Sequence, residues 1–373
     1  MLENAILLIR INSIDEFKLY SVAAFMAESP REVRKIQFTG KSTFIVSLPK
    51  RWVTRMGLGA GSRLIIMEQG ESLILTPEGV GRVIAEPIEA IIRVSASDSP
   101  DKVVREIISL YLVGYNHISV RALDGCINTV HRNAVKELVR KKLVGVEIVS
   151  ESPGEVKLQV LISYPELSVE AALRRMCFIA SSMHGEVLEA LKAMDKRLAR
   201  EVIELDDEVD RFGLYIIRQL KAAVQDAKIL RDVGLSSPRD CLGYRVIVKF
   251  VERIADHAVK IAENLQGMEE GLGEAVTHKF EEISNFVRAI FQDAITALFK
   301  GDYLSAEAVI AKSKAIAQLE DEALKLAQRD GVKSMAAIRM MLESLRRAAE
   351  YAGDIAEVVL NLNIHKVVAS VNA

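Results

Sequence analysis

Cysteine and aromatic residues are scarce in this sequence. The three cysteines, Cys126, Cys177 and Cys241, lie far apart and form no Cys-x-x-Cys pair, and only 5% of the residues are aromatic. Such cysteine usage argues against a disulfide scaffold and a thiolate metal site, and it indicates a reducing compartment. No apolar run approaches the ~20 residues of a membrane span, and the apolar core near the N-terminus is too short for a signal peptide. We therefore expect a cytoplasmic protein without a transmembrane segment.

Residue sets that support catalysis are also missing. None of the six histidines has a glutamate three residues before it, which disfavours a carboxylate-bridged di-metal oxidase. No nucleophile with a neighbouring general base is recognisable. Residues 40–43 resemble the end of a phosphate-binding P-loop, but Lys35 stands where that motif needs a glycine. The sequence therefore predicts a protein that is not an enzyme.

Positive charge is concentrated near the N-terminus. The chain of 373 residues has a formal net charge of −2, but residues 31–64 hold eight basic residues against one acidic residue. This segment thus has a formal charge of +7, and the rest of the chain has −9. A basic segment on an otherwise acidic chain indicates a separate module that binds a polyanion.

Residues 31–80 combine short strand-like segments with tight turns. Pro49 stands at the favoured first position of a helical turn at residues 50–56. The four predicted strands are residues 33–38, 42–48, 63–67 and 72–76. Residues 1–30 match no pattern, and we expect a flexible or untranslated extension, with Met26 as the hypothetical start.

The domain predicted at residues 31–80 resembles a known family. Residues 40–50 (Gly-Lys-Ser-Thr-Phe-Ile-Val-Ser-Leu-Pro-Lys), Gly57, Gly61 and residues 73–77 (Leu-Ile-Leu-Thr-Pro) are similar to the AbrB/MazE-type swapped-hairpin domain, although Arg63 stands where that family often has an acid. The resemblance implies an intertwined homodimer that binds DNA. A dimerisation module with a solvated basic face is the alternative. The candidate contacts to DNA phosphates are Arg34, Lys35, Lys41, Lys50, Arg51 and Arg55.

Residues 83–165 alternate between strand and helix patterns. Ser99 precedes a proline and caps the first expected helix. The expected order is strand 88–94, helix 102–112, strand 118–122, helix 128–143, and strands 146–149 and 156–162. This βαβαββ order predicts a small open sheet with helices on one face, in a linker or ligand-sensing domain.

From residue 168 onward the pattern is helical. Glycines 267, 271 and 273 divide it into halves of three long helices each, at residues 168–267 and 273–365. The second helix is expected to run unbroken over residues 196–232, and the fifth from residue 302 to 330. Short connections favour antiparallel neighbours, hence two three-helix bundles. The predicted fold class is therefore multidomain α+β: a small swapped-hairpin β domain, a βαβαββ linker domain and an all-α pair of three-helix bundles.

Pairs of carboxylates at helical spacing recur in the two halves. On a helix, residues i and i+4 share a face, and like charges there destabilise the helix by roughly 0.2–0.5 kcal/mol unless a cation lies between them. Chance placement of 51 acids gives roughly seven such pairs, so the matching positions in the repeat matter more than the spacing. The first half holds Asp206 with Asp210 and Glu252 with Asp256, and the second holds Glu350 with Asp354 and Glu320 alone, because Leu324 replaces its partner.

This repeat resembles the PhoU family of phosphate-uptake regulators. The most specific stretch is Glu-Arg-Ile-Ala-Asp-His at residues 252–257. The resemblance implies metal clusters on the acidic motifs, and all-oxygen ligands suit Mg, Mn or Fe, with Zn also considered. The first-half site would use Asp206, Asp210, Glu252 and Asp256, and a weaker second site would use Glu320, Glu350 and Asp354. A solvated or salt-bridged stripe of acids is the alternative.

The leading hypothesis is a DNA-associated regulator of phosphate uptake. Its partners would be DNA, a second copy of the chain, and a phosphate transporter ATPase or sensor protein. The alternatives are a transport adaptor without a DNA role and a metal-binding structural protein. The metal, the operator and the direction of regulation do not follow from the sequence.

Overall fold

The computed structural model describes residues 32–40, 43–69, 71–78, 89–162, 167–329 and 334–368. It forms two compact units, Met1–Ile84 and Ala85–Ala373. The expected extension at 1–30 and the candidate DNA contact Lys41 lie outside the described residues. Within the described residues, no helix combines the length and apolarity needed to cross a bilayer.

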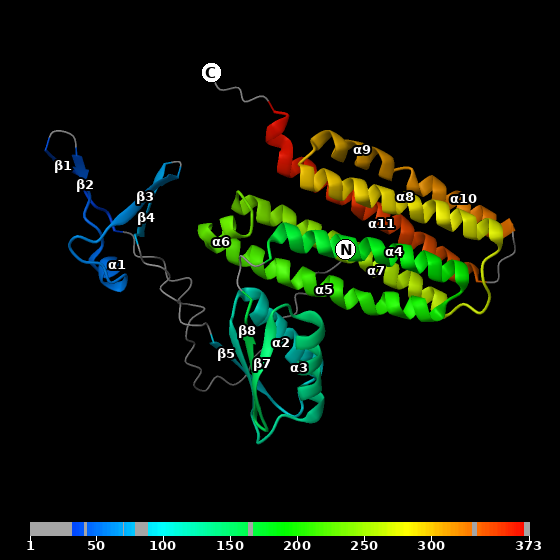
Figure 1. Cartoon of the computed structure of the whole chain (residues 1–373), viewed down its shortest axis with the longest axis horizontal. Helices are drawn as coiled ribbons and strands as arrows, with labels where there is room; N and C mark the ends of the chain where they lie inside the picture. Colours follow the sequence, from blue (N-terminus) through cyan, green and yellow to red (C-terminus); the bar gives the residue numbers. More distant parts are fainter. Residues whose placement is uncertain are drawn as a thin grey trace, which may run out of the picture. The chain divides into compact units, whose positions relative to one another are not determined.

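The first unit is built from two short antiparallel hairpins and one helical turn (Figure 1). Its elements are β1 (Gln37–Thr39), β2 (Thr43–Ile45), α1 (Lys50–Arg55), β3 (Leu64–Gln69) and β4 (Ser72–Pro77). β1 and β2 are shorter than the strands predicted at 33–38 and 42–48. Pro77 is the one buried residue among those whose burial is described here, and Val33, Phe44 and Leu73 are largely exposed. The described residues of this unit thus form no hydrophobic core of their own, and isolated two-stranded hairpins are marginally stable in water.

The second unit begins with the expected βαβαββ arrangement. Strands β5 and β6 are parallel, and the β7–β8 hairpin joins β6 in antiparallel fashion, giving the sheet order β5-β6-β8-β7. The side chains of Ser99 and Asn128 cap α2 and α3, whose apolar faces pack against the sheet around Ile107, Val120 and Val135. The elements are β5 (Glu89–Val94), α2 (Pro100–Val113), β6 (His117–Ala122), α3 (Thr129–Lys142), β7 (Val146–Ser152) and β8 (Glu155–Val160).

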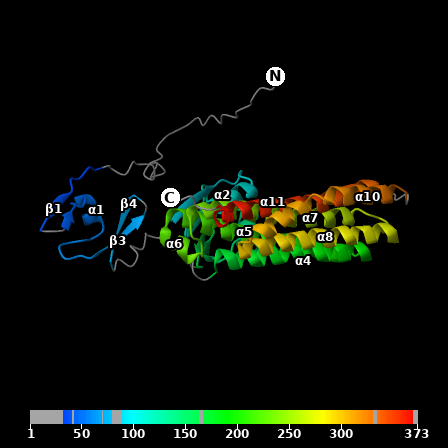
Figure 2. The same cartoon turned by 90° about the horizontal axis from the view of Figure 1, so that it is seen from above.

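The rest of the second unit is a long helical body (Figures 1 and 2). Helices α4, α5 and α7 form one three-helix half, and α8, α11 and the α9–α10 pair form the other. The elements are α4 (Val169–Ala193), α5 (Lys196–Gln225), α6 (Ala227–Asp232), α7 (Pro238–Gln266), α8 (Glu274–Lys300), α9 (Tyr303–Ser313), α10 (Ile316–Arg329), α11 (Met335–Asn363) and the 3₁₀ turn η1 (Ile364–Lys366). The predicted pair of three-helix bundles is confirmed as the architecture of this region.

Two of the predicted helices are interrupted. The helix expected over residues 196–232 breaks at Asp226, whose carboxylate accepts hydrogen bonds from the backbone N–H groups of Lys228 and Ile229 and so starts α6 as a new helix. The helix expected over residues 302–330 breaks between α9 and α10, next to Ser313. The Ser313 hydroxyl donates to the Ile310 carbonyl, a local bond that competes with regular helix geometry.

The two halves share one core, and buried polar groups lie where they meet. α7 packs along α11, where the rings of Phe250 and Tyr351 lie 5.8 Å apart, and α4 packs along α8. His184 on α4 is 2% exposed, and its Nε2 lies 2.8 Å from the Ile254 carbonyl oxygen on α7. The Arg288 guanidinium on α8 also lies near His184. Burial and that cation keep the imidazole neutral in the folded protein.

The α/β part is fastened to α5. Leu214 packs against its core, and the buried Arg218 guanidinium donates hydrogen bonds to main-chain carbonyls at the end of α2. Arg218 also donates to the Asn116 side chain at 2.7 Å, and it lies against the Tyr111 ring. A buried guanidinium needs all its donors satisfied, so this contact fixes the α2 end of the α/β part on α5.

We expect the unfolding free energy of the His184→Gln variant to fall less at acidic pH than that of the wild type. Burial lowers the pKa of His184 to about 4 from 6.5, so below pH 6.5 the unfolded chain binds a proton that the folded chain does not. The wild type should therefore lose ~1.4 kcal/mol of unfolding free energy relative to the variant for each pH unit between about 6.5 and 4. Urea unfolding as a function of pH measures this difference. Replacement of the exposed His278 is the control, and parallel curves for wild type and His184→Gln would contradict the expectation.

Candidate functional site

Three of the predicted acids come together on the first half of the bundle. Asp206 and Asp210 are one turn apart on α5, and Asp256 lies on the neighbouring α7. All three are half-buried. Burial, together with the nearby carboxylates of Asp210 and Asp256, raises the pKa of Asp206 to about 7. Burial likewise raises the pKa of Asp256, with Asp210 contributing. Burial and mutual repulsion thus disfavour the ionised forms of Asp206 and Asp256.

Lysines already engage this acidic surface. Lys142, at the end of α3 in the α/β part, donates to Asp210 Oδ2 at 2.9 Å and lies 3.4 Å from Asp207 Oδ1. Burial alone would lower the pKa of Lys142, but its bonds to Asp210 and Asp207 outweigh burial and raise the pKa. On α7, the Lys249 ammonium donates to Glu252. Two of the four predicted ligands are therefore held by ammonium groups.

The oxygen ligands of the cluster suit a hard cation, but the positions of the side chains do not form a metal site. Among the described residues, no three His, Cys, Asp or Glu side chains converge closely enough to hold a metal ion. Asp206 Oδ1 is nevertheless buried and has no hydrogen-bond partner, which leaves one oxygen available to a cation. Carboxylate oxygens are the ligands that Mg²⁺ and Mn²⁺ prefer. Asp206, Asp210 and Asp256 would hold the ion, provided that Asp210 exchanges its ammonium partner for it.

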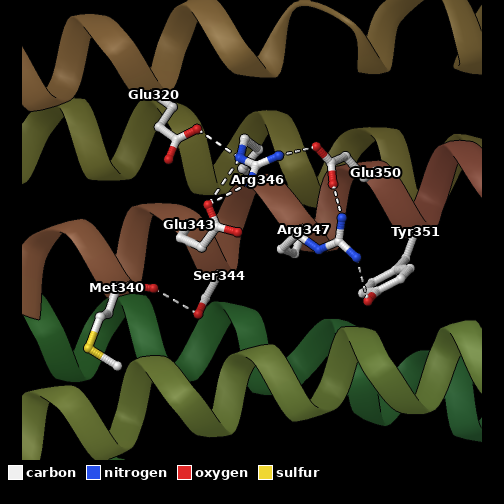
Figure 3. A network of polar contacts seen from close by, with 8 residues as sticks. All are labelled: Glu320, Met340, Glu343, Ser344, Arg346, Arg347, Glu350 and Tyr351. Atoms are coloured by element: carbon white, nitrogen blue, oxygen red, sulfur yellow. Dashed lines mark hydrogen bonds and ion pairs between the residues drawn. The ribbon is translucent and has the colours of Figure 1, made fainter. Parts of the chain in front are cut away.

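An arginine occupies the corresponding place in the second half (Figure 3). The Arg346 guanidinium on α11 lies 2.9 Å from the Glu320 carboxylate on α10, and it also pairs with Glu343 and Glu350 on its own helix. Arg347 contacts Glu350 at 2.5 Å and donates to the Tyr351 hydroxyl at 2.9 Å. Glu320 and Glu350 are thus neutralised within the chain. Burial still raises the pKa of Glu320, despite the adjoining guanidinium.

The other members of the second acidic set offer little to a metal ion. Leu324 is partly buried and packs against the hydrophobic core, as an apolar residue at this position should. Asp354 lies one turn beyond Glu350, and burial and Glu357 raise its pKa. The residues predicted as a weaker second site therefore do not fit a metal ion in this structure. Arg346 was not among the residues predicted from the sequence, although its position four residues before Glu350 is typical of a helical ion pair.

The predicted DNA contacts occupy the short basic unit. Lys50, Arg51 and Arg55 are exposed on α1, and the two arginines line a groove together with Trp52 and other residues. Arg34 and Lys35 are exposed before β1, and Arg34 pairs with Glu32.

Comparisons with known proteins identify the two regions. The model of the PhoU domain matches residues 173–265 and 280–359, and the model of the antidote-toxin recognition MazE family of bacterial antitoxins matches residues 37–82. No curated protein matches the chain.

Two solved structures are similar to the helical part. PhoU from Pseudomonas aeruginosa is 24% identical, with a TM-score of 0.47 over 53% of this chain and 96% of that one. The phosphate transport system regulatory protein PhoU from Streptococcus pneumoniae is 19% identical, with a TM-score of 0.46 over 54% and 96%.

We expect Arg346→Met to destabilise the helical body. Glu320 is 16% exposed and Arg346 26% exposed, so loss of the guanidinium leaves the Glu320 carboxylate without its cation in a poorly solvated place. The unfolding free energy should fall by about 1–3 kcal/mol, as measured by urea unfolding. Lys325→Met removes an exposed ion pair with Asp321 and should cost less than ~0.5 kcal/mol. Equal losses of unfolding free energy in the two variants would contradict the expectation, because the Arg346 ion pairs would then stabilise the protein no more than an exposed ion pair does.

Proposed function

The chain carries two PhoU domains behind an N-terminal domain of the MazE/AbrB type, and on this premise we propose that it is a DNA-associated regulator of phosphate transport. The observation that carries the proposal is that one chain combines a basic unit whose described apolar side chains are mostly exposed with a bundle that holds a half-buried carboxylate cluster. The first is suited to dimerisation and DNA, and the second to a hard cation. The proposed location is the cytoplasm.

Dimerisation of the first unit would bury apolar side chains that are exposed in a single copy. Ile36, Phe38 and Phe44 are each at least 60% exposed, and Ile66 and Leu73 are exposed to a similar extent. Burying one such side chain is worth about 1.5–3 kcal/mol, so the five from each of two copies together would offset an association cost of roughly 4–15 kcal/mol. The homodimer would gather the basic residues of two copies, Lys50, Arg51 and Arg55 among them, into one surface for phosphate contacts.

The helical part would bind a metal cation and interact with components of phosphate transport. Asp206, Asp210 and Asp256 would bind the metal, and Glu252 would join them on release from Lys249. The proposed protein partners are the ATPase of a phosphate transporter or a sensor protein. A transport adaptor that never meets DNA remains the competing function, and the salt dependence of DNA binding separates the two.

We expect Lys50→Ala combined with Arg51→Ala to weaken DNA binding and to flatten its salt dependence. Each phosphate contact that is lost should reduce the slope of log affinity against log salt by roughly 1. Fluorescence anisotropy with duplex DNA over a range of salt concentrations measures the slope. Arg63→Ala is the control, because this arginine lies 3.6 Å from Glu78 and is outside the proposed contact set. Absence of binding by the wild type at low salt would favour the adaptor.

We expect Asp210→Ala combined with Asp256→Ala to lower the metal content of the protein without loss of helix. The two substitutions remove two of the three clustered carboxylates. Elemental analysis after loading with Mn²⁺ and desalting gives the stoichiometry, and circular dichroism checks the helices. Glu320→Gln is the matched control, because its carboxylate is paired with Arg346 and should contribute nothing. Unchanged stoichiometry in the double variant would refute the site.

A further inference from the structure

We propose that strand β5 is a docking edge for a second copy of this chain, so that the α/β parts of two copies join into one continuous sheet. The inference goes beyond the proposed function and depends on neither metal nor DNA. It concerns the four-stranded sheet β5-β6-β8-β7, in which β5 and β7 are the outer strands. Among the described residues, β5 pairs with β6 alone.

One hydrogen bond shows which backbone groups of β5 face outward. The Val94 carbonyl accepts from the Leu123 N–H at 2.9 Å, just beyond β6, so Val94 directs its backbone polar groups toward β6. Every second residue of a strand directs these groups to the same side. The N–H and C=O groups of Glu89, Ile91 and Arg93 therefore point away from β6, along the outer edge of the sheet.

The two outer strands differ in regularity. β7 carries a bulge between Ile148 and Ser150, and bulges are a usual means by which proteins protect a sheet edge from further pairing. β5 pairs with β6 in unbroken register along its whole length, and its Ile91 side chain is 47% exposed. The sheet thus presents one regular edge that another strand can extend.

The sequence of β5 is complementary to itself in the antiparallel direction. When two copies pair about a two-fold axis at Ile91, Glu89 of each copy lies opposite Arg93 of the other. The residues that face outward are then the residues that pair, and each such pair forms two backbone hydrogen bonds. Opposite charges directly across two strands stabilise the pairing. A guanidinium has five N–H donors, so Arg93 can bind this glutamate besides its contacts within its own chain.

A groove beside β5 would receive the second copy. It has a volume of about 490 Å³, and Ile91 and Arg93 of β5 and Lys102, Glu106 and Leu110 of α2 contribute to its lining. The lining thus combines apolar side chains with charges of both signs. An interface about a two-fold axis needs this combination, because the same patch of each copy meets itself.

The test is a disulfide between two copies of the full-length protein. The Cα atoms of a hydrogen-bonded antiparallel pair lie about 5.5 Å apart, within the range that a disulfide spans. Ile91→Cys, combined with Cys126→Ser to remove the exposed cysteine, should therefore form a cross-linked dimer under mild oxidation. Ser150→Cys in the same background is the matched control, because Ser150 is exposed on the other outer strand. Non-reducing gel electrophoresis should show a several-fold higher yield for Ile91→Cys.

Charge reversal tests the register of the two strands. Glu89→Arg, added to the Ile91→Cys protein, places arginines opposite each other and should slow cross-linking roughly 3–10-fold. Arg93→Glu should slow it to a similar extent, and the two reversals together should restore the original rate. Glu89→Arg also removes the hydrogen bond that the Ser119 hydroxyl donates to Glu89, but that loss would persist in the double reversal. Recovery of the rate therefore reports the pairing between copies.

Two results would overturn the proposal. One is equal cross-linking of Ile91→Cys and Ser150→Cys, which would show that β5 of one copy does not meet β5 of another. The other is a double reversal that cross-links as slowly as either single reversal, because the predicted register would then be wrong. Circular dichroism checks that every variant is folded. Absence of DNA or Mn²⁺ binding would refute the proposed function and leave the pairing of β5 standing.

Discussion

Half-buried carboxylates on adjacent helices need a cation, and the helical part of this protein is arranged around how that need is met. The repeat brings acids of two packed helices together in each half, where water solvates them poorly. In the second half the cation is Arg346, which shares its helix with Glu343 and Glu350. In the first half it is Lys142, which belongs to another domain. The two halves thus neutralise their acids with cations from different parts of the chain.

Helix α5 is the element on which the second unit depends. One face packs into the bundle, and another carries Asp210 together with Leu214 and Arg218, which hold the α/β part. Asp210 lies two turns before Arg218 on this helix, and its ion pair with Lys142 is a second contact between α5 and the α/β part.

Much of the fold could be predicted because its signals are local. The strand and helix order, the cap at Ser99 and the repeat of long helices all follow from short-range pattern, and the structure has them. The two helix breaks could not be placed, since Asp226 and Ser313 resemble ordinary helix residues until their side chains bond the backbone. Local hydrogen bonds of this kind compete with the helix only weakly, so sequence pattern alone does not reveal them.

The sequence by itself determined where acids gather and that Leu324 weakens the second set, because helical spacing and internal repetition are properties of the chain in one dimension. Only the tertiary structure decided which cation each set meets. Lys142 reaches Asp210 across 68 residues, and Arg346 reaches Glu320 from a neighbouring helix. Charge neutralisation depends on distance in space and on burial, and neither is defined before the helices pack.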